Sequence, residues 1–88
     1  MANPKQVSFG RDIRPKFRDV DVKHMEPFGV LLDDYSYMSS DVDNHKNAQD
    51  VYDFLVGDKK PQMPLNGPYW TADQLQLYQQ WMKDGYQS

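Results

Sequence analysis

Residues 71–85 read TADQLQLYQQWMKDG, and this stretch carries the clearest structural signal in the chain. Thr71 followed by Gln74 is a capping-box pattern, in which each side chain binds a free N–H group at the start of a helix. Apolar side chains then recur at helical spacing, at Leu75, Tyr78, Trp81 and Met82. Gly85 is a natural helix end. The pattern predicts a helix that begins after Thr71 and buries one face.

A proline-rich loop precedes this helix, and a second helix precedes the loop. Residues 59–68 read KKPQMPLNGP and cannot be helical throughout, because proline lacks the backbone N–H that a helix needs. Asn66-Gly67 within this loop is a turn signal. From about Asn44 to Val56 the spacing of apolar residues gives an amphipathic stripe, formed by Ala48, Val51, Tyr52 and Leu55. Gly57 predicts the end of this second helix.

The N-terminal half is predicted to hold one more helix and a long loop. Phe9 to about Asp19 has apolar residues four apart, at Phe9, Ile13 and Phe17, with Ser8 as its cap. Pro15 must lie in the first turns of this helix, since proline is poorly tolerated further in. Residues 20–43 are predicted to be loop-rich and to wrap over the core, with one helical turn near residues 35–38. Together these segments predict an all-α fold with three main helices and long loops.

The bulk composition bounds the class of protein. The chain has 88 residues, so we expect a single domain spanning residues 1–88, and it has no cysteine. It therefore has no disulfide, no thiolate-ligated metal and no cofactor attached through a thioether. A chain this short buries only about 60% of the surface that it exposes when unfolded, so its core must be rich in large side chains. Four Phe, two Trp and six Tyr meet that need.

Charge and hydropathy exclude two kinds of partner. The net charge is −3, and the basic cluster of Arg11, Arg14, Lys16 and Arg18 is interrupted by Asp12 and Asp19. This cluster is typical of a solvated helix face, so we expect no nucleic-acid partner. No apolar stretch approaches the roughly 18 residues that span a bilayer, so we expect no membrane partner. The N-terminal residues lack the apolar segment of a signal peptide, which predicts a cytoplasmic protein.

An ordered set of short motifs runs along nearly the whole chain. It consists of Phe9-x-x-Asp12-Ile13-x-Pro15-x-Phe17, then His24, then Gln62-Met63-Pro64, then Gly67-Pro68-Tyr69-Trp70, then Trp81-Met82-x-x-Gly85. This order resembles the small bacterial class I cytochromes c. In that family a Cys-x-x-Cys-His motif holds haem covalently, and the histidine and a methionine from a later loop are its axial ligands. The resemblance implies a topology in which the first and last helices pack together.

The resemblance fails at the covalent anchors. The attachment motif falls on Val20-Asp21-Val22-Lys23-His24, so Val20 and Lys23 stand where the family has cysteine. His24 and Met63 match the two axial ligands. The stretch Asp21-Val22-Lys23-His24-Met25 is similar to one in haem-less cytochrome c-like proteins. The resemblance therefore implies a domain without covalent haem, and leaves non-covalent, b-type haem between His24 and Met63 as an alternative.

The space that haem occupies in the family must be filled in some way. A cavity on the order of several hundred Å³, at roughly 24 cal/mol per Å³, would cost more than a small domain's whole stability of about 5–15 kcal/mol. We expect the chain itself to fill the space, and therefore no cofactor. The side chains available for this come from the loops: Phe28, Leu31, Leu32, Tyr35, Tyr37, Met38, Met63 and Trp70.

The expected function is non-catalytic. The chain lacks a glycine-rich phosphate loop, and no pattern selects acid–base residues or a catalytic triad, so we expect no enzyme. The resemblance implies an accessory or interaction module whose partner is another protein, such as an oxidase or a metalloenzyme. Tyr69, Trp70 and Tyr86 are its candidate interface, because Trp and Tyr dominate binding hot spots. Besides the b-type haem protein, a small metal-binding protein using His24 and His45 with Asp33 or Asp34 stays an alternative.

Overall fold

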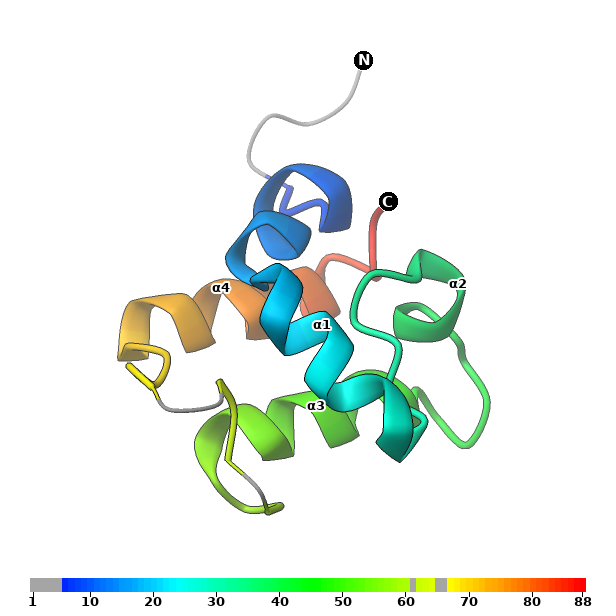
Figure 1. Cartoon of the computed structure of the whole chain (residues 1–88). Helices are drawn as coiled ribbons and strands as arrows, with labels where there is room; N and C mark the ends of the chain where they lie inside the picture. The colour runs from blue at the N-terminus through cyan, green and yellow to red at the C-terminus, as the bar shows by residue number, and fades with distance from the viewer. Residues whose placement is uncertain (1–5, 61, 65–66) are drawn as a thin grey trace.

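The structure is a computed structural model that describes residues 6–60, 62–64 and 67–88. These residues form seven helical segments and no strand. The segments are η1 (Phe9–Ile13), η2 (Arg14–Lys16), α1 (Asp19–Met25), η3 (Glu26–Phe28), α2 (Tyr35–Met38), α3 (Lys46–Val56) and α4 (Ala72–Lys83) (Figure 1). The prediction of an all-α fold is confirmed for this part of the chain.

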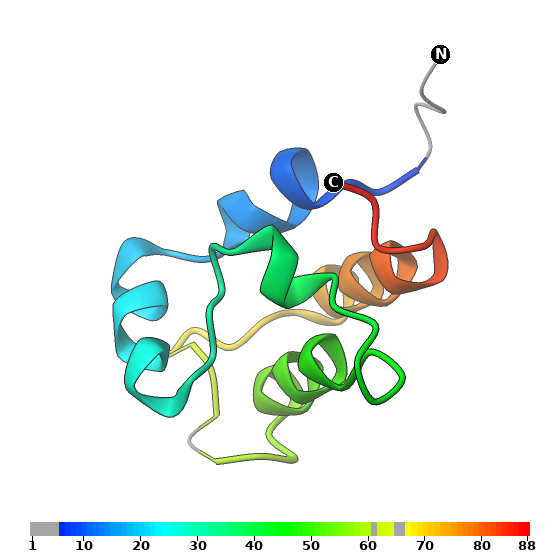
Figure 2. The ribbon, with the colours of Figure 1, turned by 90° about the vertical axis from the view of Figure 1, so that its right-hand side faces the viewer.

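The two ends of the described chain lie side by side. The backbone N–H of Phe9 donates to the carbonyl of Gln87 over 2.8 Å, and that of Gly10 donates to the carbonyl of Ser88 over 3.0 Å. Figure 2 shows these ends meeting beside the C-terminal end of α4. The ring of Phe9 lies 5.6 Å from the ring of Trp81, so η1 packs directly on α4. The first and last helical segments are thus in contact.

The first predicted helix is shorter and less regular than expected. Ser8 caps it as predicted, with its Oγ accepting from the N–H of Arg11 over 3.3 Å. The segment is then a π-helical turn followed by a 3₁₀ turn, and it ends at Lys16 rather than near Asp19. Pro15 explains the break, because it has no N–H to continue the α-helical hydrogen bonds. Phe17 is already extended, with φ −88° and ψ 127°.

A helix follows this break where a loop was expected. α1 starts after Arg18, whose backbone N–H donates to Asp21 Oδ2 over 3.0 Å. That bond places a carboxylate at the first turn, where it satisfies a free N–H group. A second unpredicted segment, the 3₁₀ turn η3, follows α1 directly. The later part of the long loop is as predicted: its residue Leu32 is fully buried, and Tyr35–Met38 forms the expected helical turn.

The two C-terminal helices follow their sequence patterns closely. α3 begins at Lys46 because Asn44 and His45 have left-handed backbones, with φ of 59° and 62°. It ends at Gly57, whose φ of 91° suits a residue without a side chain. α4 has the predicted capping box: the N–H of Thr71 donates to Gln74 Oε1 over 2.8 Å, and the N–H of Gln74 donates to Thr71 Oγ1 over 3.3 Å.

The core lies between α3, α4, η1 and the long loop. Its nine largest fully buried side chains are Trp81, Tyr78, Ile13, Met25, Leu32, Met38, Leu55, Met63 and Val51. The hydroxyl of Tyr78 donates to the carbonyl of Ala48 over 2.8 Å, which ties α4 to α3 inside the core. Among the loop side chains expected in the core, Leu31, Tyr35 and Tyr37 are only half-buried. Phe28 is wrong: it is 56% exposed, because the turn of η3 places it at the surface against His24.

The buried hydroxyl of Tyr78 should make the stability of the fold decrease at alkaline pH. Burial raises its pKa well above the ordinary value, so it stays neutral in the folded state while unfolded tyrosine ionises above about pH 10. Stability should therefore be full below about pH 10 and fall as the pH rises further. Tyr78→Phe should flatten this fall, at the expense of about 1 kcal/mol at neutral pH for the lost hydrogen bond.

Urea unfolding between pH 7 and pH 11 measures both effects. Tyr37 and Tyr86 also have pKa values raised by burial, so some alkaline destabilisation should remain in the variant. An unchanged pH slope in Tyr78→Phe would show that Tyr78 is not the group responsible.

Candidate functional site

The two residues that match haem ligands lie in different parts of the fold. His24 is the second-last residue of α1, and Met63 lies in the loop after α3. Met63 is 2% exposed, and its backbone N–H donates to the carbonyl of Phe54 over 2.9 Å. Its side chain belongs to the hydrophobic core. The side chain of Met63 thus packs in the core.

His24 has one unexplained feature. Its ring lies edge-on to the exposed ring of Phe28, with 5.9 Å between centroids. Its Nε2 is buried and has no hydrogen-bond partner among the residues that the structure describes. A buried ring nitrogen without a partner is uncommon, and an imidazole nitrogen in that state is also what a metal ligand requires.

The second histidine, His45, also has a buried ring nitrogen without a partner among the described residues, Nδ1, but its surroundings differ. The ring of His45 stacks on that of Tyr86, with 3.8 Å between centroids and an interplanar angle of 3°. Within the described residues, no group of three or more His, Asp or Glu side chains could hold a metal ion. The structure therefore does not bring together the set of His24, His45 and Asp33 or Asp34.

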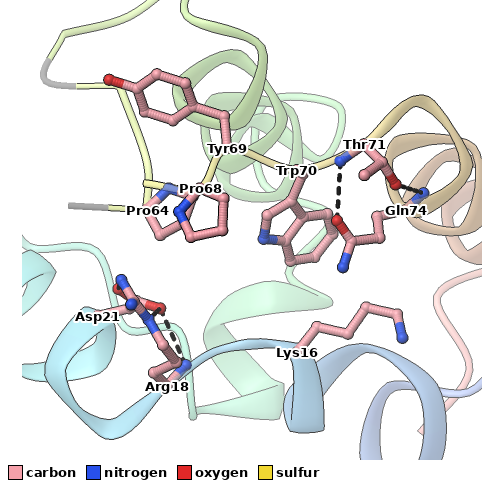
Figure 3. Close-up of a pocket in the computed structure, with 9 residues that line it drawn as sticks. All are labelled: Lys16, Arg18, Asp21, Pro64, Pro68, Tyr69, Trp70, Thr71 and Gln74. Atoms are coloured by element: carbon pink, nitrogen blue, oxygen red, sulfur yellow. Dashed lines mark hydrogen bonds and ion pairs between the residues drawn. The ribbon is translucent and has the colours of Figure 1, made fainter. Parts of the chain in front are cut away.

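Two of the three candidate interface residues share a cleft. Tyr69 and Trp70 line a cleft of about 320 Å³ that is open to solvent (Figure 3). The loop before α4 forms one wall, through Pro64, Pro68 and Tyr69, and the segment from η2 into α1 forms the other. Tyr69 is 53% exposed at the rim, whereas Trp70 is 8% exposed. The cleft is thus an aromatic and proline-lined surface feature.

Tyr86 is not part of this cleft. It follows α4 at the other end of that helix, where its ring contacts Trp81 as well as His45. The backbone carbonyl of Tyr86 accepts from the hydroxyl of Tyr35. The three candidate residues therefore do not make one continuous surface, and the cleft contains only Tyr69 and Trp70.

The core holds Trp70 in a fixed position. Its ring lies 5.5 Å from that of Phe17 and 6.2 Å from that of Tyr78. Figure 3 shows its indole nitrogen turned into the cleft, between the two walls. The cleft therefore has a rigid aromatic floor with one N–H donor.

An ion pair closes one end of the cleft. Asp21 is 4% exposed, and its Oδ1 and Oδ2 accept from the guanidinium of Arg18 over 2.9 and 3.1 Å. The hydrogen bonds that Arg18 donates to Asp21 raise the pKa of Arg18. Asp21 belongs to the motif that resembles the haem-attachment stretch, but its pairing with Arg18 could not be predicted, because α1 was expected to be loop.

The basic cluster around the cleft is largely neutralised. Arg11 pairs with Asp12 over 2.7 Å, and Arg14 lies 3.7 Å from Asp19. The side chain of Lys16 makes no hydrogen bond or ion pair with any described residue, although its charge contributes to lowering the pKa of Asp12, after the hydrogen bond from Arg11. Lys16 lines the cleft, and it forms no ion pair with Asp21, the carboxylate that also lines it.

Comparison with known proteins adds no assignment. No family model matches the chain, and searches of curated proteins and of solved structures return no match. In the described part of the chain, no helix is both long and apolar enough to cross a bilayer.

Proposed function

We propose that this chain is a non-catalytic, haem-less cytochrome c-like module that binds another protein through the cleft beside Tyr69. The observation that carries the proposal is the exposed ring of Tyr69 above a cleft of about 320 Å³ with Trp70 as its floor. The partner that the resemblance suggests is a cytoplasmic oxidase or metalloenzyme.

The arrangement of the aromatic rings supports binding at this place. Tyr and Trp are the residue types most enriched in binding hot spots, which form where a rigid ring meets a pocket on the partner. Trp70 is held by Phe17 and Tyr78, so little side-chain freedom is lost when a partner covers it. The large ring of Tyr69 lies at the rim and is exposed to solvent, so a partner can reach it.

The packing of the interior supports a haem-less domain. Four of the loop side chains expected to fill the haem space are buried: Leu32, Met38, Met63 and Trp70. Leu32 and Met38 are fully inaccessible to solvent. Side chains in these positions keep the interior dense without a cofactor.

The b-type haem protein is kept as a second candidate because of one observation. The Nε2 atom of His24 is buried and lacks a partner among the described residues, and haem iron would supply one. Neither His24 nor Met63 lines the cleft, so haem would have to displace the packing around Met63. That cost favours the haem-less proposal.

Site-specific photo-crosslinking in the producing cells tests the interaction proposal. A photoreactive phenylalanine analogue replaces Tyr69 in one strain and Val42 in a control strain. Val42 is 65% exposed and does not line the cleft. We expect a light-dependent adduct with one protein at position 69 and none at position 42.

The crosslinked protein must then bind the purified domain directly. Tyr69→Ala should weaken that binding without changing the fold, because exposed substitutions usually alter stability by about 0.5 kcal/mol or less. Absence of an adduct at position 69, or equal adducts at both positions, would refute the cleft as the binding face.

A further inference from the structure

Several side chains of the cleft beside Tyr69 present hydrogen-bond donors. Gln74 shows this most clearly. Its Oε1 accepts from the N–H of Thr71, which can only donate, so its amide nitrogen must face the other way. Figure 3 shows that nitrogen turned away from Thr71, on the same side of Trp70 as Lys16. Gln74 therefore offers N–H groups to the cleft.

Lys16 and Trp70, like Gln74, present hydrogen-bond donors to the cleft. Lys16 contributes an ammonium group, which has donors only, and Trp70 contributes an indole N–H. The one carboxylate in the lining, Asp21, already accepts from Arg18 through both oxygens. The side-chain groups that Lys16, Gln74 and Trp70 offer to a ligand are thus donors, and that of Lys16 carries a full positive charge.

An acceptor with negative charge matches such a lining. A carboxylate has only acceptors when ionised, and it would lie between Lys16 and Gln74 without displacing the Arg18–Asp21 pair. Many phosphopeptide-binding sites use clusters of arginine, but Asp21 here engages the guanidinium of Arg18. A single free ammonium group, that of Lys16, matches the single negative charge of a carboxylate.

The rest of the cleft indicates what the carboxylate is attached to. Beside the donors lie Pro64, Pro68 and the rings of Tyr69 and Trp70, which suit an apolar side chain. Sites for small molecules usually enclose about 70–90% of the ligand surface, whereas this cleft is open and its aromatic rim continues into solvent. An open cleft of this kind suits a chain segment that extends past it.

We infer that the cleft binds an acidic peptide segment of the partner protein, with an Asp or Glu carboxylate at Lys16 and Gln74 and a neighbouring apolar or aromatic side chain over Trp70. This inference rests on the proposed function, because it assigns the chemistry of the partner to the same cleft. It makes Lys16 the residue that determines specificity and Tyr69 with Trp70 the residues that supply contact area.

Selection from a displayed library of random 12-residue peptides tests the inference. The library is selected on the purified protein, on Lys16→Glu and on Lys23→Glu. Lys23 is the matched control, since it is an exposed lysine in α1 that does not line the cleft. We expect the wild type and Lys23→Glu to enrich Asp or Glu next to an apolar residue, and Lys16→Glu to lose that enrichment.

Synthetic copies of a selected peptide give the magnitude. Lys16→Glu removes the ion pair and adds repulsion between like charges, so it should raise the Kd by about tenfold. Replacing the acid of the peptide by its amide should raise the Kd for the wild type but not for Lys16→Glu. Circular dichroism confirms that each variant is folded.

The outcomes separate this inference from the proposed function. Peptides that lack acidic residues, yet lose binding in Tyr69→Ala, would overturn the carboxylate inference and leave the interaction face standing. Peptides whose binding depends on neither Tyr69 nor Lys16, or an absence of selected peptides, would overturn both.

Discussion

Trp81→Ala should lower the free energy of unfolding by about 3–5 kcal/mol, which is a large share of the roughly 5–15 kcal/mol that stabilises a domain. Trp81 is fully buried in α4, and its ring lies 5.2–5.6 Å from the rings of Phe9, Tyr78 and Tyr86. Its removal leaves a cavity where η1, α4 and the C-terminal residues meet. Urea unfolding followed by far-ultraviolet circular dichroism measures the loss.

Trp81→Phe is the matched control for the hydrogen bond. The indole Nε1–H of Trp81 donates to the carbonyl of Gln87 over 2.8 Å, and phenylalanine keeps a ring but loses this donor. We expect Trp81→Phe to be destabilised less than Trp81→Ala. A loss below about 1 kcal/mol in Trp81→Ala would contradict the packing described for the two termini.

Met63→Ala should lower the free energy of unfolding by about 2–5 kcal/mol, although Met63 lies in a loop. The reason is that its side chain is 2% exposed and belongs to the hydrophobic core. Loop positions usually tolerate such changes, so a large effect here would identify Met63 as a filler of the interior. The same urea titration measures it.

Met63→Leu separates packing from sulfur chemistry. Leucine has a similar volume and no thioether, and such exchanges usually cost less than about 1.5 kcal/mol. If Met63 only fills space, Met63→Leu should unfold close to the wild type. If Met63→Leu is as unstable as Met63→Ala, then the sulfur has a role that packing does not explain.

The sequence predicted those elements whose signals are local. The α4 capping box involves residues three positions apart, and the α3 stripe repeats within a few turns, so neighbouring residues determine both. The Tyr35–Met38 turn was predicted as well. In each case a short sequence pattern predicts the helix, and the residues at its start or end suit the backbone there.

The first helix and α1 were not predicted correctly, for reasons that also lie in the backbone. The apolar spacing of Phe9, Ile13 and Phe17 suggested one continuous helix, but Pro15 interrupts the hydrogen bonds and Phe17 is extended. α1 is only seven residues long and carries polar residues at many positions, so periodicity gave a weak signal. Its start depends on Asp21, which caps the backbone of Arg18.

The cleft is a tertiary feature, and only part of it could be predicted. Tyr69 and Trp70 were candidate interface residues because of their residue types. Lys16, Asp21 and Gln74 were not, because they reach the cleft from segments far apart in the sequence. Gln74 was recognised as a cap, yet its free amide nitrogen follows only from the hydrogen bond to Thr71.

Titration of the purified protein with haemin, followed by absorption spectra with and without reductant, tests the haem-less account most directly. The account predicts no sharp Soret band that saturates at one haem per chain, and the same weak, non-saturating spectrum in His24→Ala and Met63→Leu. A Soret band that saturates at one equivalent in the wild type and disappears in His24→Ala would contradict the account and make His24 a haem ligand.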